Sequence, residues 1–584
     1  MRNSLLSLGL ACTLGLSAAH AQTPTWQWAA QTVNPTPTNE SEARAREIVT
    51  DAAGNSYVGV GLQPRNGAAS VRNFGSTTLS STATSTSAAV AKLNAAGQWQ
   101  WATLISVQNA NDPTDNPAIF MGDIVVTPAG DIFIEGPVDD KATSIRIGTV
   151  TLNLTPNTQE ERMFVARLNS SGQCIWITAV NGASSSGMVL NPVNGELVLA
   201  GSYSGGSVAF GSTTLPAPAV LDDDALFVAR LSQAGQWTSA LGVRTVGNGD
   251  VTGEDIAIGS QGQVAVSVGV QAGSVTLGST TINASSIDKM VVAQLSPAGQ
   301  WQWVAQSSGS SSSLDLADIE YDSNGNVWVM NDDNAGGQIG SLTLPANTIG
   351  FVGRISTTGQ WNLAGAVTSS NGGRFAGGNN MAVDAQGNPV LIGSAEGQTG
   401  TAYAYSFGTR ALSFTDRGAF VARFNTNGTW QYAIKGPTAT SPNGNPQYTF
   451  NSLALDQAGN LLVSGNVFAS TIPFGSSTVV GSYRDMFVAK LTNAGATLGV
   501  RQAAGTQPLA LYPNPVAAGT AATLRLASPA TSPQPVTLRN ALGQTVRQTS
   551  IAAGRQEAAV ATDGLAPGVY LLEAGLSRAQ VVVQ

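Results

Sequence analysis

The sequence predicts an all-β protein built from a repeated unit, and three observations lead to this prediction. Charged residues make up only 11% of the 584-residue chain, hydrophobic residues reach 42%, and glycine alone accounts for 66 positions. Such a composition suits short strands joined by many turns. Three short phrases recur in the same order seven times, and each repeat carries turn-forming Asp, Asn and Gly at fixed places.

The first phrase combines a strand pattern with a turn signal. It reads Phe-Val-Ala-Arg-Leu-Asn-x-x-Gly-x-Trp in its fullest form, and an Asn that opens a type I turn before a left-handed Gly closes a tight hairpin. We therefore expect a strand, a turn and the start of a second strand in each copy. The copies begin at Ala88, Met163, Leu226, Met290, Gly350, Ala419 and Met486.

Two further phrases complete the unit. One resembles Asp-Ile-Ala-x-Asp-x-x-Gly-Asn and begins at Arg46, Gly122, Gly187, Glu254, Ala317, Asn380 and Asn451. The other is Phe-Gly or a similar pair and lies at Phe74, Ile147, Phe210, Leu277, Ile339, Phe407 and Phe474. Together the phrases predict four main strands in two hairpins, with the Phe-Gly phrase as a short strand or ordered loop.

Four-stranded units repeated seven times predict a seven-bladed β-propeller, because closure of the ring leaves only short, protected edges. A β-helix has much shorter coils than these units. An extra tryptophan strand, Trp26 to Ala29, precedes the first unit, whereas the last copy, Ala496 to Val500, lacks tryptophan. We therefore expect the first blade to consist wholly of N-terminal residues, with the last copy as an exit strand or a redundant closure strand.

These repeats resemble the seven-bladed propeller repeat proteins found among bacterial secreted proteins. The resemblance covers Trp26 to about Ala504, which is most of the chain. It implies a fold and says little about function, because propellers serve binding, scaffolding and catalysis alike.

The N-terminus has the features of a secretory signal peptide. Arg2 precedes an apolar run that ends at Ala19, and Ala19 with Ala21 forms an A-x-A cleavage site. We expect residues 1–21 to be removed and the mature chain to begin at Gln22. The apolar run is too short to span a bilayer, and we expect no transmembrane segment in the mature protein.

Removal of this segment limits the chemistry that the mature protein can perform. His20 is the only histidine, and of the two cysteines only Cys174 remains. Serine–histidine and cysteine–histidine catalysis, histidine-ligated metals and an intrachain disulfide are therefore excluded. The chain carries a net charge of −8 and contains no basic run, so we expect no nucleic-acid partner.

The repeat stops after Ala504, and the remaining residues predict a small β-sandwich. The motif Tyr512-Pro513-Asn514-Pro515, followed by Gly568-Val569-Tyr570, resembles the C-terminal sorting domain of type IX secretion substrates. The family commonly has lysine before the last hydrophobic strand, where this chain has Arg578. An ordinary accessory β-domain or a Pro-rich linker is the alternative.

The resemblance implies export from a Bacteroidetes-type bacterium to the outer-membrane surface or the extracellular space, after Sec-type passage through the periplasm. It also implies two partners, the type IX machinery and a sortase-like peptidase. The predicted organisation is therefore a signal peptide over 1–21, a propeller over 22–504 and a sorting domain over 505–584.

The recurring tryptophans are the most conspicuous candidate residues. Residues i and i+2 of a strand share a face, and burial of so many indoles stabilises a fold more than a sugar stack would. We interpret them as packing between blades, with exposure to a ligand as the alternative for some. They are Trp28, Trp99, Trp101, Trp176, Trp237, Trp301, Trp303, Trp361 and Trp430, with Trp26 preceding them. Cys174 aligns with a tryptophan position and is expected to be a buried apolar residue.

Charged residues give weaker signals. A ring of basic residues, which Gln294 interrupts, predicts structural ion pairs, with an anion site as the alternative: Lys92, Arg167, Arg230, Arg354, Arg423 and Lys490. Acidic clusters could bind calcium but lack the spacing of a calcium loop: Asp222 to Asp224, Asp315 with Asp318, and Asp332 with Asp333. We therefore predict no metal, no other cofactor and no catalytic residue.

The sequence favours a secreted, non-enzymatic propeller that binds an extracellular glycan or protein, as an adhesion or scaffold module. A secreted carbohydrate-active hydrolase or lyase, acting through carboxylates on a propeller face, is the alternative. A purely structural surface-layer component is a third possibility. Because a site must break the repeat, we expect it near the irregular loops Asn109 to Phe120 and Gly436 to Thr449.

Overall fold

The computed structural model is all β, as the sequence predicts, and this fold class is confirmed. It describes residues 24–36, 40–109, 117–155, 161–284, 289–306, 318–331, 337–370, 374–396, 403–415, 417–442, 447–492, 510–526, 528–530, 533–540, 545–574 and 577–584. These residues contain no helix of the length and apolarity that spanning a bilayer requires.

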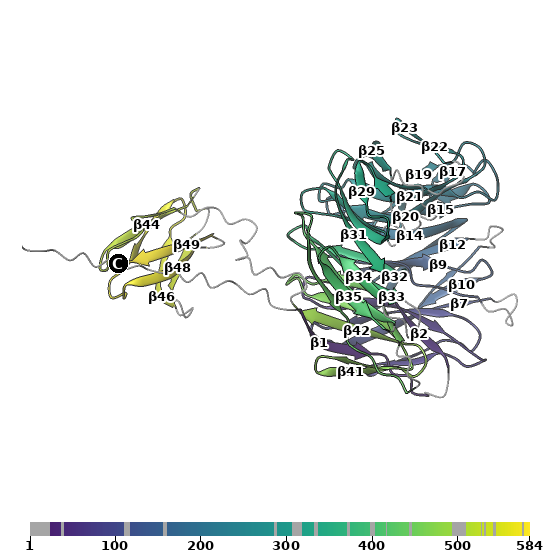
Figure 1. Cartoon of the computed structure of the whole chain (residues 1–584), viewed down its shortest axis with the longest axis horizontal. Helices are drawn as coiled ribbons and strands as arrows, with labels where there is room; N and C mark the ends of the chain where they lie inside the picture. The colour runs from purple at the N-terminus through teal and green to yellow at the C-terminus, as the bar shows by residue number, and fades with distance from the viewer. Residues whose placement is uncertain are drawn as a thin grey trace, which may run out of the picture. The chain divides into compact units, whose positions relative to one another are not determined.

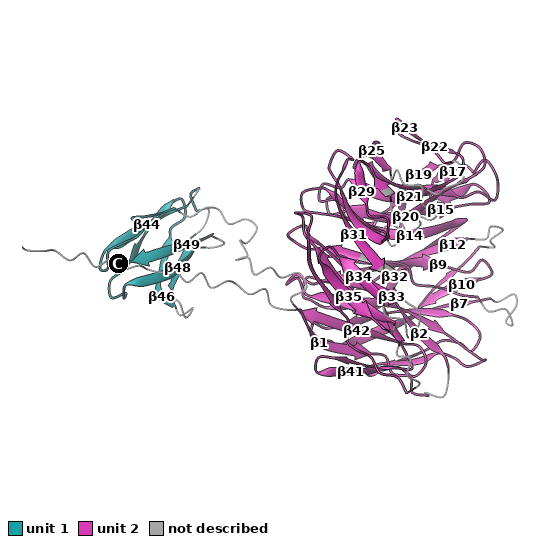
Figure 2. Ribbon diagram, viewed as in Figure 1, with its two compact units in different colours: residues 1–19, 497–584 teal, residues 20–496 magenta. Residues whose placement is uncertain are grey.

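The chain divides into two compact units (Figure 2), an N-terminal unit, His20–Ala496, and a C-terminal unit that includes Thr497–Gln584. The predicted signal-peptide residues Ala19, Ala21 and Gln22 lie outside the described residues. The predicted boundary after Ala504 does so too. These boundaries therefore stay predictions.

Seven antiparallel sheets of four principal strands make up the described part of the N-terminal unit (Figure 1), and we number them in chain order, innermost strand first. Sheet 1 has β2 (Glu42–Thr50), β3 (Ser56–Gln63), β6 (Ser87–Leu93) and β7 (Trp99–Gln108); sheet 2 has β8 (Ile124–Val126), β9 (Ile132–Pro137), β12 (Arg162–Leu168) and β13 (Cys174–Asn181); sheet 3 has β14 (Ala183–Leu190), β15 (Leu197–Tyr203), β18 (Ala225–Leu231) and β19 (Trp237–Val243). Sheet 4 has β20 (Asp250–Ile258), β21 (Val264–Gln271), β24 (Lys289–Leu295) and β25 (Trp301–Gln306); sheet 5 has β26 (Asp318–Tyr321), β27 (Val327–Asn331), β30 (Thr348–Ile355) and β31 (Trp361–Ser370). Sheet 6 has β32 (Arg374–Val383), β33 (Pro389–Glu396), β36 (Gly418–Phe424) and β37 (Trp430–Lys435); sheet 7 has β38 (Gln447–Leu455), β39 (Leu461–Phe468), β42 (Asp485–Thr492) and β1 (Thr25–Gln31).

The Phe-Gly phrases form small two-stranded hairpins between the second and third strands of each unit. Gly turns each hairpin in the left-handed region, with φ of 59° at Gly75. The hairpins are β4 (Val71–Phe74) with β5 (Thr77–Ser80), β10 (Ser144–Ile147) with β11 (Val150–Asn153), β16 (Val208–Phe210) with β17 (Thr213–Leu215), β22 (Ser274–Leu277) with β23 (Thr280–Asn283), β28 (Gly337–Ile339) with β29 (Leu342–Leu344), β34 (Tyr403–Phe407) with β35 (Arg410–Phe414), and β40 (Thr471–Phe474) with β41 (Ser477–Val480).

The predicted hairpin turns are confirmed. In the turn between β6 and β7, the Gly97 N–H donates to the Asn94 carbonyl at 2.9 Å, and Gly97 has a φ of 79°. The Asn94 side chain accepts the N–H groups of Ala96 and Gln98. These hydrogen bonds from the turn to the Asn94 side chain stabilise the turn conformation in which Gly97 is left-handed.

The innermost strands form a closed ring. Each of them contacts the innermost strand of the next sheet, in the order β2, β8, β14, β20, β26, β32 and β38, and β38 returns to β2. The second and third strands are buried on both faces, as in β3, where only the last residue is partly exposed. Neighbouring sheets therefore cover one another, which is the arrangement of β-propeller folds.

One prediction about the ring is wrong in part. The four principal strands of the first sheet are all N-terminal, from Glu42 to Gln108, as expected, but the extra tryptophan strand is not one of them. Instead β1 pairs antiparallel with β42, for example Ala30 with Val488, and forms the outer strand of the last sheet. Main-chain hydrogen bonds between the two ends of the unit thus close the ring. The degenerate copy from Ala496 to Val500 lies outside the described residues.

The repeated tryptophans occupy two kinds of position. Those at the start of an outer strand pack on the Phe-Gly hairpin of their own unit, as Trp99 does on Phe74 with ring centroids 5.1 Å apart. Those two residues later lie over the hairpin turn of the next sheet, as Trp101 does over Gly172. The Trp101 indole N–H also donates to the Ser170 carbonyl of that turn at 3.2 Å.

The second kind of position recurs around the ring. Trp28 lies over Gly97, Trp176 over Gly235 and Trp303 over Gly359. A Cβ at Gly97 would meet the Trp28 ring at 2.5 Å, so the close approach requires glycine there. That these tryptophans stabilise the sheet-to-sheet contact stays a prediction.

Replacement of the Trp101 indole tests this role. We expect Trp101→Ala to destabilise the protein by about 2–3 kcal/mol, because the variant loses half-buried aromatic contacts and one inter-sheet hydrogen bond. Denaturant unfolding measures the difference. The control is Gln100→Ala, whose side chain is exposed on the same strand. Equal stability of both variants would contradict a packing role for Trp101.

The C-terminal unit is a small β-sandwich. One sheet contains β43 (Ala510–Tyr512), β44 (Ala521–Arg525) and β47 (Glu557–Ala561), and the other contains β46 (Thr545–Ile551), β45 (Gln534–Arg539), β48 (Gly568–Ala574) and β49 (Ser577–Val583). Both sheets contribute to one apolar core, with Leu524 from the first and Leu572 from the second fully buried. The unit thus has a core of its own.

Candidate functional site

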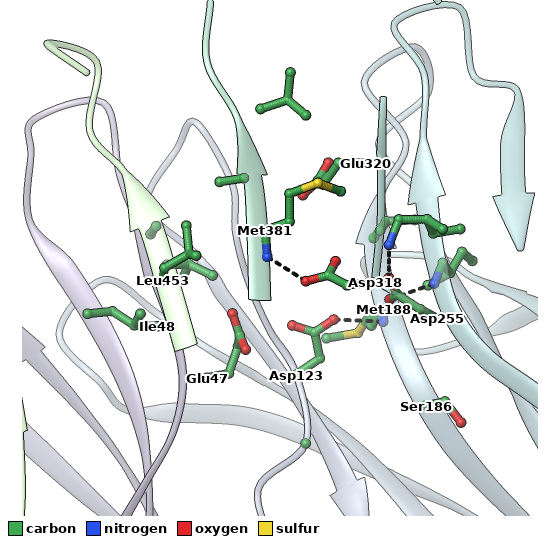
Figure 3. A pocket seen from close by; sticks show the side chains of 18 of the residues that line it. Glu47, Ile48, Asp123, Ser186, Met188, Asp255, Asp318, Glu320, Met381 and Leu453 are labelled. Carbon is green, nitrogen blue, oxygen red and sulfur yellow. Dashed lines mark hydrogen bonds between the residues drawn. The ribbon is translucent and has the colours of Figure 1, made fainter. Parts of the chain in front are cut away.

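A cavity of about 810 Å³ lies where the innermost strands of the N-terminal unit meet. Figure 3 shows Glu47, Asp123 and Asp318 pointing into the same space; Glu47 lies on β2, Asp318 on β26, and Asp123 directly precedes β8. Among the described residues that line the cavity, every charged side chain is acidic: Glu47, Asp123, Glu135, Glu254, Asp255, Asp318 and Glu320. The cavity is therefore a strongly acidic site in the described part of the unit.

Repetition in the sequence places these carboxylates together. The second repeated phrase carries Glu47, Asp123, Asp255 or Asp318 four residues before its turn residue, and the equivalent residues of the other units include Gly187 and Ser452. Because equivalent strands of a closed ring face its axis at equivalent positions, the four acids converge on one space.

Asp123 joins two sheets through both of its carboxylate oxygens. Oδ1 accepts the N–H of Ile124 at 2.7 Å, and Oδ2 accepts the N–H of Met188, on the innermost strand of sheet 3, at 2.9 Å. A carboxylate that accepts two main-chain N–H groups satisfies donors that would otherwise be buried without partners.

Asp255 and Asp318 repeat this arrangement. Asp255 accepts the N–H of Ile256 and, across to sheet 5, the N–H of Ile319, both at 2.7 Å. Asp318 accepts the N–H of Met381 of sheet 6 at 2.6 Å. Each of these three acids therefore accepts a main-chain hydrogen bond from the next sheet in the ring, and we call this contact a clasp.

A hydroxyl takes the place of the carboxylate where the ring closes. The N–H of Ile48 in sheet 1 donates to Oγ of Ser452 in sheet 7 at 3.1 Å. At this junction a serine hydroxyl therefore accepts the main-chain N–H that a carboxylate accepts elsewhere in the ring.

Glu135 differs from the clasping acids. It is 1% exposed, lies on β9 beside Gly122, and its Oε1 accepts the N–H of Asp123 at 2.7 Å. No residue that the structure describes lies at hydrogen-bond geometry from its Oε2, while the nearby Ser185 hydroxyl lowers the pKa of Glu135. A buried carboxylate oxygen without a partner is costly, so this atom is available to a proton or to a ligand.

Burial raises the pKa values of the carboxyl groups in the cavity. It raises the pKa of Glu135 to about 8, and the neighbouring charge of Asp123 adds to the effect. Burial likewise raises the pKa of Glu47 to about 8, of Glu320 to about 7 and of Asp123 to about 6. At neutral pH the cavity therefore holds protonated and ionised carboxyl groups side by side.

The wall of the cavity is asymmetric. Sheets 1, 2, 4 and 5 supply the acids, and sheet 3 supplies Ser185 and Ser186. Sheets 6 and 7 contribute mainly apolar residues, including Met381, Val383, Leu453 and Leu455, so that one side is charged and the other apolar. The repeat is broken here, as a site for a specific ligand requires.

The basic ring of the sequence pairs with turn residues of the same sheets, not with the cavity. The pairs are Lys92 with Asp51 at 4.0 Å, Arg167 with Asp131 at 2.8 Å, Arg230 with Glu196 at 3.8 Å, Lys490 with Asp456 at 2.9 Å, and Arg423 with Asp384. Arg354 instead hydrogen-bonds Asn362 and lies over the ring of Trp328. These residues stabilise the hairpins, as the sequence favours.

Of the acidic clusters singled out in the sequence, Asp318 lies in the cavity, whereas Asp222 to Asp224 do not line it. The described parts of the loops Asn109 to Phe120 and Gly436 to Thr449 do not line it either. Asp223 and Asp250 accept main-chain N–H groups, and Asp315, Asp332 and Asp333 lie outside the described residues. Within the described ranges, no group of three or more Asp, Glu, His or Cys side chains is arranged to hold a metal ion. Cys174 is partly exposed, not buried as the sequence predicts. Desolvation raises the pKa of its thiol to about 11, so that little thiolate forms at neutral pH.

The sorting motif organises the end of the C-terminal unit. The Asn514 side chain donates to the Gln580 carbonyl at 2.7 Å and accepts the N–H of Val582 at 2.9 Å, which fixes the motif to β49. Tyr512 is exposed and donates to Glu557, while Tyr570 is buried and donates to the Ala566 carbonyl.

Comparison with known proteins defines the C-terminal unit. Residues 510–583 match the family described as the secretion system C-terminal sorting domain. The protein therefore carries a type IX sorting domain, and the predicted export to the cell surface or the extracellular space is confirmed. No curated protein matches the chain.

Several solved structures are distantly similar. They include a protein of unknown function from Dyadobacter fermentans (9% identity, 80% of this chain and 98% of that chain, TM-score 0.38), an ulvan lyase of a new polysaccharide lyase family (10%, 77% and 98%, 0.35), and dipeptidyl peptidase 4 from Porphyromonas gingivalis (10%, 73% and 65%, 0.26). At these TM-scores the similarities carry no conclusion about function.

The raised pKa values predict that stability falls as pH rises. A carboxyl group whose pKa is higher in the folded than in the unfolded protein contributes stability below the unfolded value, and this is lost as pH rises through the folded value. We expect Glu135→Gln to raise the unfolding midpoint at pH 8.5 by about 2 °C or more and to change it little at pH 4.5.

Thermal unfolding between pH 4.5 and pH 8.5 measures this effect. Exposed Glu40 provides the control, because Glu40→Gln removes a charge without touching the cavity. A midpoint difference for Glu135→Gln that does not vary over this window would contradict the raised pKa.

Proposed function

We propose that the protein is a seven-bladed β-propeller, with each of the seven sheets as one blade, that acts outside the cell as a non-enzymatic binding module. Seven sheets with a closed ring of innermost strands support the blade count. The asymmetric acidic cavity carries the functional proposal, because acidic residues from four of the seven sheets meet there and the other sheets supply none.

The cavity favours a ligand with a positively charged group next to an apolar part. Seven acidic side chains line it with no basic side chain among the described lining residues, and the opposite wall is apolar. Oε2 of Glu135, which receives no hydrogen bond from the residues that the structure covers, offers a buried polar atom to such a ligand. Because no three carboxylates among the described residues are arranged around one point as metal ligands are, an alkylammonium or guanidinium group of a peptide or polyamine fits better than a bare ion.

Binding of model cations tests this proposal. We expect spermidine and pentalysine to bind the full-length secreted protein, with an affinity that rises between pH 6 and pH 8.5 as the carboxyl groups ionise. The double variant Glu47→Gln, Glu320→Gln should weaken binding about 10-fold or more, since each charge-assisted contact contributes about 1.5–3 kcal/mol.

Calorimetric titration measures these affinities, with Glu40→Gln as the control that keeps the cavity intact. Equal affinity of the cavity variant and the control would overturn the proposed site. Tight binding of Ca²⁺ with no binding of organic cations would replace the proposed ligand class by a metal ion.

A carbohydrate-active enzyme is the second candidate, and the pair Glu135 and Asp123 favours it. With pKa values of about 8 and about 6, one holds a proton at neutral pH while the other is ionised, as general acid and base must in glycoside cleavage. Turnover of any polysaccharide that is lost on Asp123→Asn, without loss of folding, would overturn the non-enzymatic proposal.

The sorting domain makes a separate prediction about export. We expect deletion of Leu511–Gln584 to retain the protein inside the outer membrane, because the machinery then lacks its signal. Fractionation with immunoblotting measures this, and Asn514→Ala, which removes the contacts to Gln580 and Val582, should reduce export partially. Undiminished export of the deletion variant would contradict the role of the domain.

A further inference from the structure

A second, oppositely charged pocket lies at the other end of β2 from the acidic cavity. This pocket, of about 410 Å³, is lined by Glu42, Arg44, Arg65, Phe468, Tyr483 and Arg484 among others, and we call it the arginine pocket. The start of β2 lines the arginine pocket, whereas Glu47 to Thr50 near its end line the cavity. The pocket also straddles the junction of sheets 1 and 7, since the Ala43 N–H donates to the Arg484 carbonyl at 3.0 Å.

Three guanidinium groups share one carboxylate in this pocket. Glu42 is 2% exposed and contacts Nε of Arg44 at 2.7 Å, Nη1 of Arg65 at 2.8 Å and Nη1 of Arg484 at 3.2 Å. Burial alone would raise the pKa of Glu42, but the hydrogen bonds and charges of these arginines outweigh burial and lower it overall. Glu42 therefore stays ionised. The single negative charge of Glu42 therefore neutralises only part of the positive charge of the three arginines, and the pocket keeps a net positive charge.

Aromatic rings fix the orientation of two arginines. The guanidinium carbon of Arg65 lies 4.8 Å from the ring centre of Tyr483, and that of Arg484 lies 4.7 Å from the ring centre of Phe468. Stacked guanidinium groups retain their in-plane N–H donors for other partners. The rings therefore orient the two guanidinium groups and leave their N–H groups able to donate to a ligand.

Several donors in the pocket remain available. Glu42 engages only Nε of Arg44 and Nη1 of Arg65 and Arg484. Four guanidinium nitrogens have no hydrogen-bond partner among the described residues: Nη1 and Nη2 of Arg44, Nη2 of Arg65 and Nη2 of Arg484. Such a set of planar donors matches the oxygens of a carboxylate or sulfate group.

A fourth arginine adds to the excess charge. Arg46 lies two residues after Arg44 on β2, and its Nε is buried with no hydrogen-bond partner in the described part of the chain. Burial lowers its pKa, and the charges of Arg44 and Arg484 lower it further. An anion in the arginine pocket would relieve this mutual repulsion.

We propose that the arginine pocket binds the carboxylate or sulfate group of an acidic extracellular saccharide. The whole chain carries a net charge of −8, so general attraction does not bring an anion here, and recognition depends on the local cluster of arginines. Export to the cell surface or the extracellular space places the pocket where saccharides that carry such groups are accessible.

Titration of the full-length secreted protein with defined oligosaccharides tests this inference. We expect oligogalacturonate or a sulfated oligosaccharide to bind, a neutral oligosaccharide of equal length to bind at least about 10-fold more weakly, and affinity to fall as salt increases. Equal binding of free sulfate would overturn the assignment to a saccharide, and equal binding of the neutral sugar would overturn the charge recognition.

Variants separate the arginine pocket from other positive charges. Arg65→Gln with Arg484→Gln should weaken binding of the acidic saccharide about 10-fold or more, whereas Arg146→Gln, on the exposed hairpin β10–β11, should leave it unchanged. Glu40→Gln should strengthen binding, because Glu40 lies 3.8 Å from Arg65 and opposes an incoming anion. Unchanged affinity in the double variant would overturn the inference.

This inference is independent of the acidic cavity. Glu320→Gln, within the cavity, should leave binding of acidic saccharides unchanged while weakening that of cations. A protein that binds no cation would therefore contradict only the proposed role of the acidic cavity. A protein that binds no acidic saccharide would contradict only the proposed role of the arginine pocket.

Discussion

Closure of the ring by β1 is the interaction on which the rest of the N-terminal unit depends. The strand Thr25–Gln31 pairs with Asp485–Thr492, so that residues more than 450 positions apart share one sheet. With the ring closed, every innermost strand has two neighbours, and the second and third strands of each sheet are covered on both faces. The acidic cavity and the arginine pocket both follow from this closure, because one lies inside the ring and the other at its junction.

The same acidic residues hold the ring together and give the cavity its charge. Asp123, Asp255 and Asp318 each accept an N–H group of the following sheet, which compensates for part of the cost of their burial. Their positions are fixed by these contacts. Glu135 and Glu320 also line the cavity, but neither accepts a main-chain N–H of the following sheet among the hydrogen bonds of the described residues. In the proposed binding role, these are the acids that a ligand could contact without disturbing the ring.

Repetition made the fold predictable, and departure from repetition limited the prediction of the site. Turns such as Asn94 to Gly97 follow from local chemistry, and seven copies fix the order of the strands. Pairing of β1 with β42 could not be read from local patterns, because both candidate partners have the same strand pattern. The second phrase contains four acids of the cavity, but only the closed ring shows that they converge: Glu47, Asp123, Asp255 and Asp318. No repeated pattern marks Glu135, Arg65 or Arg484, so the sequence could not identify them as site residues.

Removal of the closing strand tests the account most directly. A secreted chain that lacks Thr25–Gln31 can be compared with the intact chain by hydrogen–deuterium exchange. We expect loss of protection in β42, β39 and β38 and along β2 at the junction, together with loss of both cation and acidic-saccharide binding. Unchanged protection in these strands, with both ligands still bound, would show that closure by β1 does not build the ring and would contradict the account.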